Sequence, residues 1–285
     1  MKRRQALIVG AGYVGGAVAR KLSSDGWRVW ALTRSRQWEA PIHGLRVDLG
    51  DDAAVQESFR SAAFGPRLDV VVFAVSADER TDAAYRTAYV TGLQNVLRAL
   101  ADVQLGRLII VSSTGVFAQE NGEQIDEASP AIPEHFSGRR LLESEQLARA
   151  ATAQTSIVRL GGIYGPERTR LRDLVRGGRA FASLDAPRYQ NRVHRDDAAG
   201  FLAHLAAMEA EPQALYLGVD DEPADLRAVQ AWFCQRLGKK PSSLESSALR
   251  PRPVGKRCLN TLLKASGYVL RYPSFKEGYA SLPDA

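Results

Sequence analysis

The 285-residue sequence has little of what builds disulfide networks or metal centres: two cysteines and four histidines. Cys234 and Cys258 do not form a Cys-x-x-Cys pair, and isolated thiols are typical of a reducing compartment. The histidines show no ligand spacing with cysteine or with one another. We therefore expect neither a disulfide framework nor a metal site.

Long apolar runs are also missing. No stretch approaches the roughly 18 uninterrupted apolar residues of a membrane span. The basic start, MKRRQ, leads into an apolar run that is too short for a signal peptide and passes directly into a glycine-rich loop. These features predict a cytoplasmic protein that does not bind membranes.

The formal net charge of +6 raises the question of nucleic-acid binding. The arginines are scattered along the chain, and the basic clusters lack interleaved aromatic residues. We therefore expect no nucleic-acid partner. An excess of arginine equally suits a protein that handles phosphorylated small molecules.

Short apolar runs alternate with helical patterns through the first 160 residues, which predicts a doubly wound, Rossmann-type α/β sheet. The near-continuous hydrophobicity of the central runs favours parallel strands that are buried on both faces. The predicted strands cover residues 6–9, 28–32, 45–49, 69–75, 107–113 and 156–160, with a later one at 214–218.

After the sixth predicted strand, which ends at residue 160, the sequence becomes rich in glycine and arginine and loses the regular alternation of strands and helices. This change predicts a small C-terminal lobe that binds substrate. We expect a dinucleotide-binding domain over residues 1–163, with residues 191–218 packing back on it. Residues 164–190 and 219–285 would then form the smaller lobe.

A glycine loop follows the first predicted strand and opens a helix on which apolar residues recur at helical spacing. Gly10 would allow the tight turn, Gly12 would let the backbone approach a pyrophosphate, and Gly15 would let helix and strand pack closely. The helix N-terminus would then face the phosphates. This arrangement predicts a dinucleotide cofactor that also contacts Tyr13 and Val14.

The end of the second strand indicates which dinucleotide is bound. An NAD site would place an acid about 20 residues past the loop, but Thr33, Arg34, Ser35 and Arg36 stand there. Because the Arg34 guanidinium suits a 2′-phosphate, with Arg36 as a second candidate, we predict NADP(H). Solvated surface arginines are the alternative. The expected cofactor contacts also include Asp48, placed for the adenine amino group, Ala74 and Val75.

Several segments in order resemble the extended or atypical short-chain dehydrogenases/reductases of the NAD-dependent epimerase/dehydratase superfamily. They are VSSTGVF (111–117), GEQIDEASP (122–130), RLGGIYGP (159–166), NRVHRDDAAGFLAHL (191–205) and two C-terminal segments that begin at residues 220 and 256. The resemblance covers nearly the full length. It implies an oxidoreductase with a small-molecule substrate, and suggests a homodimer.

The family's catalytic set is a Ser or Thr after the fifth strand, followed by Tyr-x-x-x-Lys at the head of the next helix. By resemblance, the first group maps to Ser113, while Ser137 stands at the tyrosine and Leu141 at the lysine. The candidates for proton handling are therefore Ser113, Ser137, His135 and Tyr89, a position near the active site in the family. Arg139 and Arg140 can stabilise an oxyanion but cannot supply a proton.

By the same resemblance, Thr114 and Tyr164 lie on the substrate side, and Arg192 and His194 are candidates to bind an anionic substrate. Packing roles are the alternative for each of them. The leading hypothesis is an NADP(H)-dependent oxidoreductase that acts on a small oxygenated or anionic metabolite with non-standard acid–base residues. Two alternatives stay open: a non-catalytic NADP(H)-binding sensor or scaffold, and a lyase or isomerase.

Overall fold

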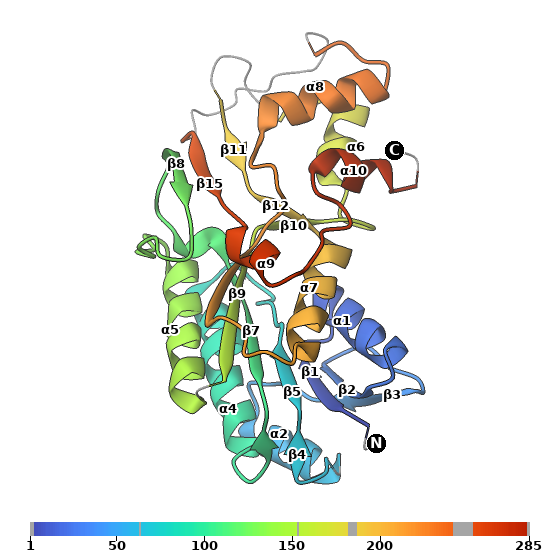
Figure 1. Cartoon of the computed structure of the whole chain (residues 1–285), viewed down its shortest axis with the longest axis vertical. Coiled ribbons are helices and arrows are strands. Elements are labelled where there is room, and N and C mark those ends of the chain that lie inside the picture. Colours follow the sequence, from blue (N-terminus) through green and yellow to red (C-terminus); the bar gives the residue numbers. More distant parts are fainter. Residues whose placement is uncertain (1–2, 63, 153, 182–186, 242–252, 284–285) are drawn as a thin grey trace. The chain divides into compact units, whose positions relative to one another are not determined.

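Figure 1 shows the chain as a computed structural model. The structure describes residues 3–62, 64–152, 154–181, 187–241 and 253–283. Two compact units divide the chain. Unit 1 contains residues 1–118, 131–159 and 199–216, and unit 2 contains residues 119–130, 160–198 and 217–285. The division expected from the sequence differs at residues 119–130, 160–163, 191–198 and 217–218, which it had assigned to the first domain.

The described strands are β1 (Gln5–Val9), β2 (Arg28–Thr33), β3 (Ile42–Arg46), β4 (Arg67–Leu68), β5 (Val70–Phe73), β6 (Gln104–Leu105), β7 (Leu108–Ser113), β8 (Asn121–Ile125), β9 (Thr155–Leu160), β10 (Gly162–Tyr164), β11 (Tyr189–Gln190), β12 (Arg192–His194), β13 (Leu215–Gly218), β14 (Ala224–Asp225) and β15 (Gly255–Cys258). The α-helices are α1 (Tyr13–Ser24), α2 (Asp52–Ser61), α3 (Asp82–Tyr85), α4 (Gly92–Ala99), α5 (Phe136–Ala151), α6 (Arg170–Arg176), α7 (Arg195–Ala207), α8 (Leu226–Arg236), α9 (Thr261–Ala265) and α10 (Phe275–Ala280). A π-helix, η1 (Arg86–Thr91), precedes α4, and a 3₁₀ turn, η2 (Thr114–Val116), follows β7.

The central sheet has seven strands in the order β13-β9-β7-β5-β1-β2-β3. The pairs β1–β2, β2–β3, β1–β5 and β5–β7 are parallel. Helices cover both faces, with α4 and α5 opposite α1 and α7 (Figure 1). The predicted doubly wound Rossmann-type sheet is therefore confirmed.

One predicted strand is displaced along the chain. The third strand runs over Ile42–Arg46, whereas the sequence predicts it over residues 45–49. The chain leaves the sheet early because Asp48 forms a turn with the backbone N–H of Gly50, at 2.9 Å. Asp51 then caps α2 by accepting a hydrogen bond from the Ala54 N–H. These local polar contacts outweigh the apolar pattern that suggested a later strand.

Unit 1 has an apolar core in which Leu7, Trp30, Phe73, Ile110 and Ile157 are buried, and the register of the strands places the first four on one face of the sheet. Unit 2 has its own core, in which Tyr164, Phe233, Phe275 and Tyr279 are buried. It contains three strand pairs, β10–β12, β11–β14 and β15–β8. Each unit therefore buries a separate apolar core.

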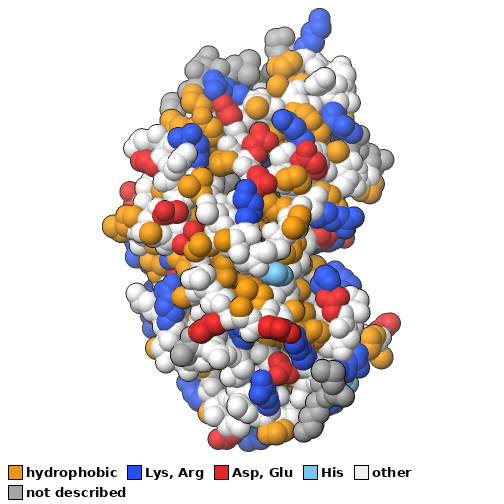
Figure 2. Space-filling model, in the orientation of Figure 1, with side chains coloured by type: hydrophobic (Ala, Val, Ile, Leu, Met, Phe, Trp, Pro, Cys, Tyr) orange, Lys and Arg blue, Asp and Glu red, His pale blue; other side chains and the backbone are white. Residues whose placement is uncertain are grey.

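Charged side chains of both signs are interspersed on the face drawn in Figure 2. Apolar and uncharged atoms separate them, and no continuous patch of one sign covers the described residues of this face.

Candidate functional site

The strand order of unit 1 reverses at β1, which lies between β2 and β5. Successive strands run outward from β1 in one direction as far as β3, and the chain then returns to the other side of β1 at β5. Ligands of open α/β sheets bind at the carboxyl ends of the strands where the order reverses. The candidate site is therefore the edge at which β1, β2 and β5 end.

The glycine loop lies at this edge. Gly10 has φ +83°, and its amide N–H donates to the Leu32 carbonyl at the end of β2, at 3.0 Å. A Cβ at Gly10 would lie 2.7 Å from the Ala74 carbonyl carbon and 2.8 Å from the Val75 Cα, so only glycine fits between the ends of β2 and β5. A Cβ at Gly15 would meet the Gly10 carbonyl oxygen.

Gly12 differs from Gly10 and Gly15, which are both crowded by surrounding atoms. It precedes the first residue of α1, and no heavy atom lies within 4 Å of the position that its Cβ would take. No side chain caps this helix, and its first turn holds no acid. The backbone at Gly12 is thus open to an approaching group, and the helix dipole favours an anion there. The loop fits a dinucleotide pyrophosphate.

Arg34 follows β2, but it is not a lone cation. Its two terminal guanidinium nitrogens donate to the two carboxylate oxygens of Asp78, which lies in the segment after β5. The side chains of Arg34 and Asp78 are 52% and 58% exposed. The hydrogen bond from Arg34 lowers the pKa of Asp78. The Asp78 carboxylate therefore lies beside Arg34, the residue predicted to bind the 2′-phosphate. The sequence itself has no acidic residue between Thr33 and Arg36.

The other predicted adenosine contacts lie around the same edge. The Thr33 carbonyl accepts a hydrogen bond from the Val47 N–H at 3.2 Å, and Ser35 is exposed. The Arg36 guanidinium lies 4.8 Å from the centre of the Trp38 ring. Asp48 is exposed and forms the turn described above. Their roles toward a cofactor stay predictions.

Sequence reasoning did not single out Trp38. The edge of its indole ring is 3.4 Å from the Cβ position of Gly16, so the ring packs against α1 one turn after the glycine loop. Its indole nitrogen is buried, and no described residue accepts a hydrogen bond from it.

The four candidates for proton handling come from elements that pack against one another. Helix α5 packs against β7, η1 and η2. Ser113 ends β7, and its hydroxyl accepts a hydrogen bond from the Gly115 N–H at 3.1 Å. His135 precedes α5 and is exposed, while Ser137 is half-buried in its first turn. Thr114 is buried in η2. Leu141, further along α5, is buried as well.

Tyr89 is the aromatic group among these candidates. It lies in the π-helix η1, a type of distortion that is frequent at functional sites. Burial raises the pKa of Tyr89 to about 12, against a hydrogen bond with the Ala77 backbone that lowers it. Its ring packs on Tyr85, at 5.3 Å between ring centres, and Tyr85 packs on Phe136. The Tyr89 hydroxyl is therefore neutral near pH 7 and can donate a hydrogen bond.

Both arginines at the head of α5 have protein partners. Arg140 binds Asp82 through two hydrogen bonds of 2.8 Å and Glu143 through one of 2.7 Å. Arg139 donates to the Glu134 carbonyl at 2.7 Å. These contacts tie α5 to α3 and to the loop before α5.

In unit 2, three residues singled out from the sequence lie together. Tyr164 is 3% exposed and donates to the Ser274 carbonyl at 3.3 Å. Its ring lies 4.4 Å from Tyr279 and 5.3 Å from His194. Arg192 donates to the Gln190 side chain at 2.8 Å. Their part in substrate binding stays a prediction.

Sequence reasoning missed Asp220, the fourth member of this group. Its backbone N–H donates to the Arg192 carbonyl at 2.7 Å, and its side chain is buried. Burial raises the pKa of Asp220 to about 8 and lowers that of His194 to about 4. No sequence motif marks this residue, because it follows β13, far from Arg192 along the chain.

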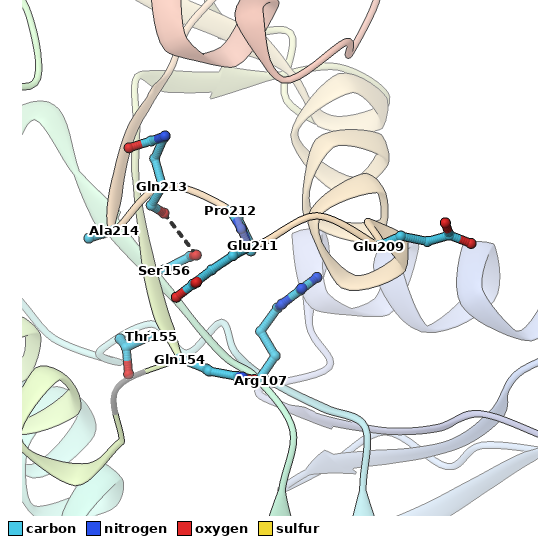
Figure 3. Close-up of a pocket in the computed structure, with 9 residues that line it drawn as sticks. All are labelled: Arg107, Gln154, Thr155, Ser156, Glu209, Glu211, Pro212, Gln213 and Ala214. Atoms are coloured by element: carbon cyan, nitrogen blue, oxygen red, sulfur yellow. Dashed lines mark hydrogen bonds between the residues drawn. The ribbon is translucent and has the colours of Figure 1, made fainter.

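A surface pocket of about 430 Å³ lies elsewhere in unit 1 (Figure 3). It is formed by the start of β9 and by the segments that precede β7 and β13, and Arg107, Glu211 and Ser156 are among the residues that line it. Ser156 donates to the Gln213 carbonyl at 2.9 Å, and the Arg107 guanidinium donates to carbonyls at the end of α7. The pocket is at the amino ends of these strands and is separate from the glycine loop.

Within the described residues, no cluster of three or more His, Cys, Asp or Glu could hold a metal ion. Over the same part of the chain, no helix has the length and apolar character needed to cross a membrane.

A model of the NAD-dependent epimerase/dehydratase family matches residues 6–179. A Methylobacillus flagellatus protein, described as an NAD-dependent epimerase/dehydratase, is 33% identical, and the alignment covers 99% of this chain and 98% of that one, with a TM-score of 0.81. MoeE5, solved with UDP-glucuronic acid and NAD, has a TM-score of 0.79 at 19% identity, covers 98% of this chain and 97% of its own, and shows the fold alone.

Two curated proteins are also similar in sequence. Protein YeeZ of Escherichia coli K12 is 27% identical over 210 residues, which are 71% of this chain and 73% of YeeZ. A 4-hydroxy-2-methyl-3-oxo-4-farnesyl-3,4-dihydroquinoline-1-oxide ketoreductase of Stigmatella aurantiaca is 28% identical over 245 residues, 81% of this chain and 72% of the ketoreductase.

Proposed function

The chain belongs to the NAD-dependent epimerase/dehydratase family, and from this premise we propose that it is an NADP(H)-dependent oxidoreductase of a small oxygenated or anionic metabolite. The observation that carries the proposal is the glycine loop. Gly10 fits only as glycine between the ends of β2 and β5, while the backbone at Gly12 is open beside an uncapped helix N-terminus. The similarity to a ketoreductase supports the reaction class.

Each part of the loop has a defined task in this proposal. The amides at the start of α1 bind the pyrophosphate, and Arg34 binds the 2′-phosphate with its planar fork. Ala74 and Val75 lie against Gly10 and set the position of the chain beside the nicotinamide half. When bound, the cofactor donates or accepts hydride.

Proton handling has to come from residues other than the family tyrosine and lysine. In this proposal Ser113 and Tyr89 donate hydrogen bonds to a substrate oxygen, and the exposed His135, which precedes α5, is the nearest imidazole to Ser137 in the sequence. General acid catalysis is typically worth about 10²–10⁴-fold, whereas correct positioning of the reactants is worth about 7–11 kcal/mol. An oxidoreductase that lacks the family tyrosine and lysine should therefore transfer hydride slowly, but it can still be active.

The burial of Leu141 favours a second candidate function. An aliphatic side chain packed where the family has a lysine suits a protein that binds NADP(H) and reports its level without turnover. A lyase or isomerase that returns the nicotinamide to its starting state is the third alternative. The sensor, the lyase or isomerase and the oxidoreductase share the same cofactor site in this proposal and differ in the reaction that follows binding.

The deciding experiment is calorimetric titration with NADPH, NADP⁺ and NADH. Replacing Arg34 with Ala should raise the Kd for NADPH about tenfold or more, since hydrogen bonds to charged groups are worth about 1.5–3 kcal/mol, and should change that for NADH less than about twofold. Arg28→Ala is the control, because Arg28 lies at the opposite end of the same strand and stacks on Trp30. Equal losses for both dinucleotides would contradict the NADP assignment.

Turnover is then measured by NADPH absorbance with a panel of carbonyl and imine acceptors. Consumption with any acceptor supports the oxidoreductase. Binding without consumption, and without conversion of any acceptor, supports the sensor. Conversion of substrate without net absorbance change supports the lyase or isomerase.

A further inference from the structure

We infer that Asp78 sets the dinucleotide preference of this protein, as a counter-ion on Arg34 that competes with the 2′-phosphate of the cofactor. The inference rests on the proposed function, because it names the residue that regulates access to the same arginine.

The position of the ion pair is its most informative feature. Arg34 follows β2 and Asp78 follows β5, and these two strands flank β1 in the sheet. The pair therefore joins the two sides of the edge at which the strand order reverses, beside the loop that contains Gly10. The residues are 44 positions apart in the sequence, so this contact arises only from the fold.

The geometry of the pair matches that of arginine with a phosphate. Both terminal nitrogens of Arg34 are directed to the two oxygens of one carboxylate, which is the fork that would grip two phosphate oxygens. The Arg46 guanidinium donates to the Arg34 carbonyl at 2.9 Å and holds the backbone in place. A 2′-phosphate cannot take the same fork unless Asp78 releases it.

The release costs little. Exposed ion pairs contribute about 0–1 kcal/mol, and both side chains here are more than half exposed. A phosphate dianion carries more charge than a carboxylate and binds arginine bidentately. NADP(H) can therefore displace Asp78, but its observed affinity is reduced by the bond it breaks. NAD(H) has no 2′-phosphate, so its binding does not require the Arg34 guanidinium and is not reduced by Asp78.

The same arrangement explains why a lone arginine at the end of β2 does not by itself fix the preference. With Asp78 in place, the pair is electrically neutral, and the site presents both a guanidinium and a carboxylate. The hydrogen bond from Arg34 lowers the pKa of Asp78, so the carboxylate remains ionised through the neutral pH range. The competition is therefore constant around pH 7.

The test is Asp78→Asn, with the matched control Glu79→Gln, which removes the same charge from the next residue of the same exposed segment. Kd values are measured by calorimetry for NADPH, NADH and adenosine 2′,5′-bisphosphate, a fragment that carries the 2′-phosphate. We expect D78N to tighten NADPH and the bisphosphate by up to about fivefold, or ~1 kcal/mol, and to change NADH less than about twofold. E79Q should change all three less than about twofold.

A double variant isolates the coupling. In the Arg34→Ala background, D78N should no longer affect NADPH, because the group it competes for is gone. Thermal unfolding of each variant verifies that it is folded, which is expected of substitutions at exposed positions.

The possible outcomes separate this inference from the proposed function. If R34A weakens NADPH selectively but D78N leaves NADPH unchanged or weaker, the cofactor assignment stands and the competition is wrong. If D78N weakens NADH about tenfold, Asp78 is itself a ligand of the ribose hydroxyl, and the inference is overturned. If neither the wild type nor D78N binds a dinucleotide, both proposals fail.

Discussion

Both units bury charged side chains, but only one of them satisfies every polar atom of its cluster. In unit 1, Glu145 is fully buried on α5, and its carboxylate accepts two hydrogen bonds from Arg159, at 2.9 and 2.8 Å. Ser112 donates a third at 2.7 Å. This network joins α5 to β7 and β9, and fixes the helix that carries Ser137.

The cluster in unit 2 is left incomplete. The Arg192 Nε, the His194 Nε2 and the Asp220 Oδ2 are all buried, and none has a hydrogen-bond partner among the described residues. The His194 Nδ1 accepts a hydrogen bond from the Asp196 N–H at 3.2 Å, so the proton of the neutral ring is on the Nε2. Two donors and one acceptor therefore face no protein partner.

The difference between the two clusters helps to distinguish buried polar residues that stabilise the fold from those that are available to bind water or a ligand. A saturated buried ion pair anchors secondary structure, whereas buried polar atoms without partners are rare in native proteins and call for water or a ligand. Arg192 and His194 keep buried atoms that water or a ligand could bond, and their part in substrate binding stays a prediction, whereas Glu145 is saturated by Arg159 and Ser112. Three substitutions test this contrast, in order of decreasing expected effect.

Glu145→Gln should have the largest effect on stability. Removing one partner of a buried pair leaves Arg159 with an uncompensated charge, which typically costs about 3–5 kcal/mol. At about 2–4 °C per kcal/mol, the Tm should fall by roughly 10 °C in calorimetry. Glu143→Gln is the control on the same helix, because Glu143 pairs with Arg140 in a partly exposed ion pair, Arg140 keeps its two bonds to Asp82, and the loss should be about 1 kcal/mol. An equal fall in Tm for E145Q and E143Q would contradict the distinction between the Glu145–Arg159 pair and the Glu143–Arg140 pair.

Asp220→Asn, in contrast to Glu145→Gln, should raise the stability of the protein at neutral and alkaline pH. The folded-state pKa of about 8 exceeds the ordinary value of 3.8, so the folded state binds more protons between these values. Stability conferred by the protonated group is therefore lost as pH rises from about 4 to about 8. The Tm advantage of D220N over wild type should be near zero at pH 4 and greatest above pH 8.

His194 opposes this trend over part of the range. Its pKa of about 4 lies below the ordinary 6.5, so its contribution to stability is lost as pH falls between these values. The two contributions oppose each other from about pH 4 to 6.5, so the effect of Asp220 should be clearest between pH 6.5 and 8. Glu222→Gln removes a neighbouring charge that raises the pKa of Asp220, so E222Q should lower that pKa and leave a pH-dependent stability, unlike D220N. A pH-independent difference between D220N and wild type would show that Asp220 is already ionised in the fold.

Ser112→Ala should have the smallest effect of the three. It deletes one buried hydrogen bond to a carboxylate, worth about 1.5–3 kcal/mol, and the Tm should fall by about 5 °C. The matched control is Ser144→Ala, since the Ser144 hydroxyl is also buried but has no partner among the described residues. S144A should be neutral or slightly stabilising. A larger loss for S144A than for S112A would reverse the contrast between bonded and unbonded groups.

The sequence predicted more of unit 1 than of unit 2. Most strands of the central sheet agree with the predicted ranges, because buried parallel strands are apolar throughout and bounded by turns. The third strand was misplaced because a carboxylate turn, rather than an apolar run, decided its end. In unit 2 the strand pairs join segments as distant as β8 and β15, and a local pattern cannot predict such pairings.

The candidate site divides in the same way. Gly10, Gly12 and Gly15 were identified because a turn and a helix start impose local backbone demands. Arg34 was identified by its place after the second strand, whereas Asp78, Asp220 and the partners of Glu145 were not identified. Each of them acquires its role from a neighbour on another strand or helix.

The amino-acid sequence by itself determined the alternation of strand and helix, the glycine loop and the absence of an acid between Thr33 and Arg36. These are properties of contiguous residues, set by side-chain periodicity and by the conformational freedom of glycine. Only the tertiary structure decided that a carboxylate nevertheless meets Arg34, and that one buried charged cluster is complete while the other is not. The physical reason is that an ion pair depends on distance in space, and the sheet brings together strands that the chain keeps far apart.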